Sequence, residues 1–86
     1  MVHINTSIGF EMDLDESCLN DMELFDSIAE VEKGHMIALP DVVNRIVGGE
    51  KQNLYDRIRN EKGHVPIDVV TAQILEIIQQ AGGKNS

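Results

Sequence analysis

The residues Asp13-Leu14-Asp15-Glu16 carry the alternating carboxylates that open a calcium-binding loop of the EF-hand type. Such a loop needs a glycine at its sixth position for a sharp turn and a glutamate at its twelfth position as a bidentate ligand. Counted from Asp13, these positions hold Cys18 and Leu24. The pattern therefore does not predict a calcium site.

The histidines and the single cysteine are the other residues that could carry chemistry. His3, His35 and His64 have spacings that match no metal-ligand motif, and each lies next to a turn signal. Cys18 has acidic neighbours, which raise the pKa of a thiol and disfavour the reactive thiolate, so we interpret it as a packing residue. The sequence contains no nucleophile elbow, phosphate loop or dinucleotide fingerprint. We therefore expect no catalytic, metal-binding or cofactor-binding residue, and no enzyme.

The acidic charge is concentrated in the first part of the chain. Of the 86 residues, which carry a formal net charge of −8, the first 34 include nine acids and one base, whereas the remainder balances six acids against six bases. Such a surface repels phosphate groups, so we expect no direct binding to nucleic acid or to a membrane surface. No stretch approaches the roughly 20 apolar residues that span a bilayer. The charge is explained either by a basic partner or, more simply, by the solubility that an acidic surface provides.

Residues 1–15 alternate between apolar and polar side chains, which is the period of a half-buried β-strand. Apolar or β-favouring residues occupy every even position from Val2 to Leu14. This run is long for one strand, because strands usually have about 5–6 residues. A break near Ser7-Ile8-Gly9 would convert it into a hairpin, with Gly9 supplying the backbone freedom for the turn. The ribbon must then pack on helices or pair with another chain.

Helical periodicity replaces the strand period from about residue 20 and predicts a helical part over 20–83. Asn20-Asp21-Met22-Glu23 fits a capping box with Asn20 as the N-cap residue. Lys33-Gly34 is a good C-terminal end for this first helix. Its apolar positions at helical spacing are Leu24, Phe25, Ile28 and Val31.

Three further helices follow at intervals set by proline and glycine. The second is expected from Pro40 to Val47, the third over about 50–60, and the last begins after Pro66 and ends at Gly82-Gly83. The apolar face of the last helix comprises Ile67, Val70, Ile74, Ile77, Ile78 and Ala81. The sequence therefore predicts one small α+β domain over residues 1–86, mainly α with about four short helices, with an N-terminal β-strand or β-hairpin and a frayed tail at 84–86.

The segment from Met36 to Val47 has more aliphatic surface than a short helix in so small a domain can readily bury. We predict that Ile37, Leu39, Val43 and Val47 contribute to a partner-binding surface, by analogy with helix-in-groove or oligomer contacts. The alternative is that the segment belongs to the core and packs against the first and last helices.

Seven short motifs follow one another between Gly9 and Ser86. They are Gly9-Phe10-Glu11, Asn20-Asp21-Met22-Glu23-Leu24-Phe25, Leu39-Pro40-Asp41, Gly48-Gly49-Glu50, Leu54-Tyr55-Asp56-Arg57-Ile58-Arg59, Gly63-His64-Val65-Pro66-Ile67 and Gly83-Lys84-Asn85-Ser86. In their order and spacing the chain resembles the small tail assembly chaperones of long-tailed phages and prophages of Gram-positive bacteria. In that family a programmed −1 ribosomal slip near the end of the short protein produces a longer fused form. Lys84-Asn85 is what the slippery stretch A-AAA-AAC would encode.

The resemblance implies a non-catalytic assembly factor of the host cytoplasm that is absent from the mature virion. Such proteins coat the long helical tape-measure protein, help to recruit tail-tube subunits and leave as the tube polymerises. Several copies on one partner, or a homo-oligomer, would add avidity to weak contacts. Two other classes stay open: a structural head or tail-completion protein that remains in the particle, and an acidic inhibitor that mimics nucleic acid.

Overall fold

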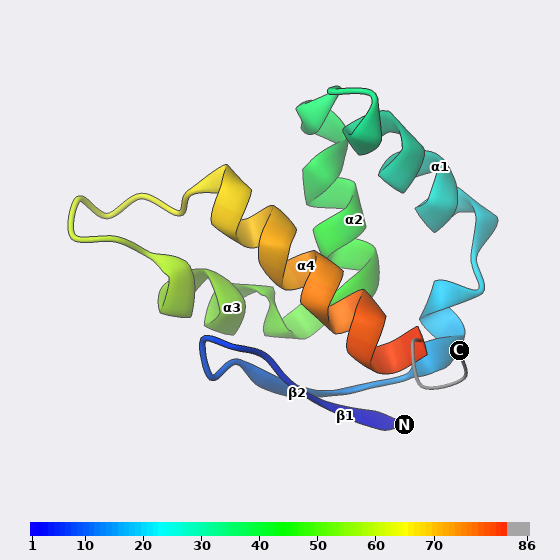
Figure 1. The fold of residues 1–86 in the computed structure, drawn as a ribbon, viewed down its shortest axis with the longest axis horizontal. Coiled ribbons are helices and arrows are strands. Elements are labelled where there is room, and N and C mark those ends of the chain that lie inside the picture. The colour runs from blue at the N-terminus through cyan, green and yellow to red at the C-terminus, as the bar shows by residue number, and fades with distance from the viewer. Residues whose placement is uncertain (83–86) are drawn as a thin grey trace.

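The computed structural model describes residues 1–82 and places an N-terminal β-hairpin along one side of four α-helices (Figure 1). The strands are β1 (Val2–Asn5) and β2 (Glu11–Leu14), and the helices are α1 (Met22–Glu32), α2 (Leu39–Ile46), α3 (Lys51–Ile58) and α4 (Ile67–Gly82). Short 3₁₀ turns at Glu16–Leu19, Met36–Ala38 and Gly48–Glu50 connect them. The predicted small α+β fold is confirmed. The predicted frayed tail at 84–86, the Lys84-Asn85 pair and the helix end at Gly83 lie outside the described residues.

In the hairpin, the side chains that face the core have even residue numbers both before and after the turn. β1 and β2 are antiparallel, and the Thr6 N–H donates to the Phe10 carbonyl over 2.9 Å. The three residues 7–9 form the loop, with Gly9 at a φ of 82°. Because three is an odd number, even-numbered side chains stay on the same face in both strands. That face is buried at Ile4, Thr6, Phe10 and Leu14.

Side chains of α4 form hydrogen bonds with backbone groups of the hairpin at the edge that β2 does not cover. The backbone N–H of Asn5 donates to Gln80 Oε1 over 3.0 Å, and Gln80 Nε2 donates to the Asn5 carbonyl over 2.8 Å. Glu76 accepts hydrogen bonds from the backbone N–H of Ser7 (2.9 Å) and from its hydroxyl (2.6 Å). The outward-facing backbone groups of Asn5 and the N–H of Ser7 thereby have partners. The ribbon packs on the helices, which is one of the two arrangements that the sequence allowed.

Helix α1 begins one residue later than the capping box predicts. Its N-cap is Asp21, whose Oδ1 accepts from the backbone N–H of Glu23 over 2.9 Å. Asn20 instead closes the preceding 3₁₀ turn, where its N–H donates to the Ser17 carbonyl over 3.0 Å. The prediction of Asn20 as N-cap is wrong because that turn uses Asn20 and aspartate caps a helix equally well. The predicted end of this helix is confirmed, with Gly34 at a φ of 94°.

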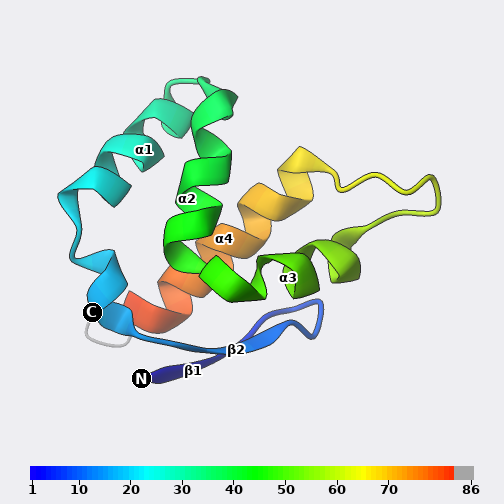
Figure 2. The same ribbon diagram turned by 180° about the vertical axis from the view of Figure 1, so that it is seen from behind.

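A single aliphatic core joins the hairpin to all four helices. Its buried members are Ile4, Phe10, Leu14, Leu24, Leu39, Val42, Val43, Ile46, Val47, Leu54, Ile58, Val70, Ile74 and Ile77. Helix α2 lies beside α1 and crosses α4 in both views of the ribbon (Figures 1 and 2), and it contacts both helices. It contributes more residues to the core than any other element, because it has neighbours on two sides.

Candidate functional site

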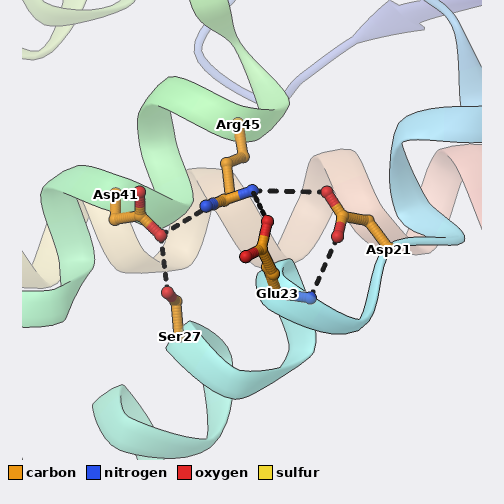
Figure 3. Close-up of polar contacts among 5 residues, drawn as sticks. All are labelled: Asp21, Glu23, Ser27, Asp41 and Arg45. Atoms are coloured by element: carbon orange, nitrogen blue, oxygen red, sulfur yellow. Dashed lines mark hydrogen bonds and ion pairs between the residues drawn. The ribbon is translucent and has the colours of Figure 1, made fainter.

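The densest polar cluster joins α1 to α2 (Figure 3). Arg45 Nε lies 2.8 Å from Asp41, and Arg45 Nη1 lies 3.3 Å from Asp21 and 3.6 Å from Glu23. The Ser27 hydroxyl also donates to Asp41. The bonds from Ser27 and then Arg45 lower the pKa of Asp41, and the bond to Asp41 raises the pKa of Arg45. The cluster holds two helices together, and because Arg45 is already surrounded by three carboxylates it offers no free positive charge to a substrate.

His3 lies on the outer face of the hairpin, with one ring nitrogen 2.9 Å from Asp13 and the other 2.9 Å from Glu11. These hydrogen bonds, the one with Asp13 first, raise the pKa of His3. Cys18 packs against the core, and its burial, with smaller effects of Asp15 and Asp21, raises the pKa of the thiol as its acidic neighbours predicted. Within residues 1–82, no group of three or more His, Cys, Asp or Glu side chains is arranged to hold a metal ion.

A small polar network lies where the hairpin meets α4. Gln73 is buried, and its Nε2 donates to Glu76 over 2.8 Å. Hydrogen bonds from Ser7 are the main cause of a lowered pKa at Glu76. Gln73 Oε1 and Thr6 Oγ1 are buried without a partner in the described chain, and each such atom costs about 1–3 kcal/mol. This network fixes the ribbon to the helix.

Three of the four residues predicted to contact a partner lie in the core. Val43 and Val47 are 0% and 3% exposed, so their prediction as surface residues is wrong. The reason is the position of α2 against two other helices, which buries more than one stripe of its side chains. Leu39 is 6% exposed, and it lines the apolar groove described next. Only Ile37 is at the surface: it is 93% exposed in the 3₁₀ turn between α1 and α2.

An apolar groove lies between α1 and α4, with α2 as its floor, and has a volume of about 230 Å³. It is lined by Ile28, Val31, Glu32, Met36, Leu39, Val42, Thr71, Ile74, Leu75 and Ile78. Glu32 is the one charged residue in this lining, and the Thr71 hydroxyl donates to the Ile67 carbonyl within α4 over 2.9 Å. The groove can therefore take aliphatic groups but has almost nothing to offer a polar ligand.

The groove is smaller than the roughly 300–1,000 Å³ of a typical pocket for a small molecule or cofactor. A second hollow, of about 340 Å³, lies on the other side of Met36 and Leu39. Its lining is more polar and includes Gln52, Tyr55 and Arg59. Within the described chain, the first groove is therefore the better candidate for an apolar contact.

The sequence pattern did not predict the exposed apolar residues on the two helices that form the walls, of which Leu75 lines the groove. Leu75 is 52% exposed and falls outside the apolar face predicted for the last helix. Phe25, one of the apolar positions at helical spacing predicted for the first helix, is 56% exposed. The available signal was that these two helices carry large apolar residues on arcs wider than a single buried stripe. A surplus of this kind indicates an additional contact surface.

The described helices include none that is both long and apolar enough to cross a membrane. Comparison of the chain with protein-family models, with curated proteins and with solved structures finds no match.

Proposed function

We propose that this protein is a non-catalytic assembly chaperone that binds helical partners through the groove between α1 and α4. Its partners are the tape-measure protein and the tail-tube subunits of a phage or prophage tail. It acts in the host cytoplasm and leaves before the virion is complete. The proposal combines the sequence resemblance with the geometry of the groove.

The observation that carries the proposal is an open groove lined almost entirely by aliphatic side chains in a very small domain. A long amphipathic helix aggregates through its apolar stripe unless another apolar surface covers it. A shallow groove covers only a short part of such a stripe, so each contact is weak and reversible. Several copies along one partner restore overall affinity through avidity.

Co-expression with the tape-measure protein encoded in the same gene cluster tests this function. The chaperone should raise the soluble fraction of that protein and co-purify with it, whereas a purified particle analysed by mass spectrometry should contain none of the chaperone. A tape-measure protein that stays equally insoluble with and without this chain would contradict the proposal. Recovery of the chain from finished particles would instead support a structural head or tail-completion protein.

That Ile37 contacts the partner stays a prediction. Because it is almost fully exposed, Ile37→Asp should leave the fold intact. If the tip of the α1–α2 connection contacts the partner, this variant should co-purify less of the tape-measure protein than the wild type.

A further inference from the structure

We infer that the groove between α1 and α4 binds a basic amphipathic helix, one whose aliphatic stripe is flanked by lysine or arginine. This inference rests on the proposed function, since it assumes that the groove takes a helical partner, and it adds the chemistry that the partner must have. Three features of the groove carry it: its lack of hydrogen-bonding groups, its arrangement of helices, and the charge along its two walls.

The lining selects a helix over an extended peptide. A strand placed in the groove would bring its backbone N–H and C=O groups against aliphatic side chains, because the Thr71 hydroxyl is already bonded within α4. Burying those groups without partners is unfavourable. A helix satisfies its own backbone and presents only side chains. With α1 and α4 as walls over α2, such a helix would complete a layered bundle.

Each wall combines a large apolar residue and a carboxylate on one helix face, in opposite order along the two helices. On α1, Phe25, Ile28 and Glu32 follow one another at the i, i+3, i+7 spacing of one helix face, and on α4 Asp68, Thr71 and Leu75 do the same. Of the two carboxylates and the two exposed apolar residues, Glu32 and Leu75 line the groove, and by helical spacing Phe25 and Asp68 continue the same two helix faces beyond it.

These carboxylates have no positive partner in the described chain. Glu32 and Asp68 form no ion pair within residues 1–82, whereas Lys33 is 3.2 Å from Glu30 and Arg45 is held by its three acids. The sequences of α1 and α4 contain six acids and no lysine or arginine. A partner with basic residues beside its apolar stripe would neutralise both rims, and a partner with acidic flanks would be repelled.

A second copy of this chain does not have the required chemistry. Among the described helices, α3 has lysine and arginine, but its apolar residues Leu54 and Ile58 are buried. The exposed apolar residues Phe25 and Leu75 lie on the acidic helices themselves. Two copies joined groove to groove would oppose like charges, which favours a different protein as the occupant.

Two synthetic peptides test the inference with the full chain. Both are helix-forming and share one leucine stripe, but one has lysine and the other glutamate at the flanking positions. Fluorescence anisotropy should show the lysine peptide binding at least about tenfold more tightly at low salt. The difference should shrink as salt rises, because the screening length falls from about 10 Å at 0.1 M to about 3 Å at 1 M.

Variants locate the binding to the groove. Leu75→Gln should weaken binding of the lysine peptide by about tenfold, as loss of a central apolar contact does. The double variant Glu32→Gln/Asp68→Asn should weaken it several-fold and remove most of the preference for lysine over glutamate flanks. Met22→Gln is the matched control, because Met22 is a 71% exposed apolar residue of α1 that is not part of the groove lining. It should bind like the wild type, and all variants should keep the wild-type unfolding temperature within a few degrees.

Equal binding of the two peptides would overturn the inference, as would an effect of Met22→Gln equal to that of Leu75→Gln. If the wild type is a dimer in sedimentation experiments and Leu75→Gln dissociates it, the groove binds a second copy of the chain instead.

The proposed function is judged separately. If the lysine peptide binds in the groove but the tape-measure protein is not kept soluble, the function fails and the groove chemistry stands. If the tape-measure protein is kept soluble equally well by the double variant and by Leu75→Gln, the function stands and the inference fails.

Discussion

Truncation of Val43 should destabilise the protein strongly, whereas truncation of Ile37 should hardly affect it. Val43 is fully buried in α2, and Ile37 is 93% exposed six residues earlier. Val43→Ala removes two methyl groups from the core, at about 0.8 kcal/mol each for lost burial plus a further amount for the cavity, so we expect about 2 kcal/mol. Ile37→Ala removes more atoms, but from a side chain in solvent, so the expected change is within about 0.5 kcal/mol.

Thermal unfolding followed by circular dichroism measures this difference directly. For a domain of this size, 1 kcal/mol shifts Tm by about 4–8 °C, so Val43→Ala should lower Tm by about 8–16 °C. Ile37→Ala should shift Tm by no more than about 4 °C. The reasoning would be refuted if the two variants had equal Tm values, or if Val43→Ala unfolded at the wild-type temperature. Either result would return Val43 to the surface on which the sequence pattern placed it.

Two further predictions concern local contacts. Asp21→Ala should cost about 1 kcal/mol as loss of an N-cap, and Asn20→Ala should stay within about 0.5 kcal/mol; urea unfolding that ranks them in the reverse order would favour the capping box. Because Asp13 and Glu11 raise the pKa of His3, the contribution of His3 to stability is fully present below its ordinary pKa of about 6.5 and is lost as pH rises through the raised pKa. The Tm difference between the wild type and His3→Gln should therefore be larger at pH 5.5 than at pH 9, and a difference that does not depend on pH would contradict this account.

The elements of the fold could be predicted because their signals are local. The alternation of Ile4, Phe10 and Leu14 through a three-residue loop needs only the period of a strand and the left-handed conformation of Gly9. The ends of α1 and α2 follow from Gly34 and Pro40 in the same way. The N-cap of α1 was misplaced by one residue because Asn20 and Asp21 cap a helix almost equally well. Only the 3₁₀ turn before the helix distinguishes them.

The sequence predicted that the candidate site is an aliphatic surface, but not which residues form it. Residues 36–47 contain more aliphatic side chains than a short helix in so small a domain readily buries, and the partner surface was therefore predicted there. The structure packs α2 against both α1 and α4, where Val43 and Val47 are buried, and leaves the excess at Leu75 and Phe25 on the outer helices. A hydrophobic pattern indicates which side of a helix is apolar, but it does not say how many neighbours that helix has.

The sequence by itself determined the strand and helix periods, most of the helix ends, the acidic charge of the first 34 residues and the lack of a catalytic motif. The tertiary structure alone decided which aliphatic residues are core, how Gln80 and Glu76 of α4 bond to the hairpin at Asn5 and Ser7, and where a groove stays open. The physical reason is the distance along the chain over which each effect acts. Backbone conformation and capping depend on residues within one or two turns, whereas burial depends on which distant segments pack together.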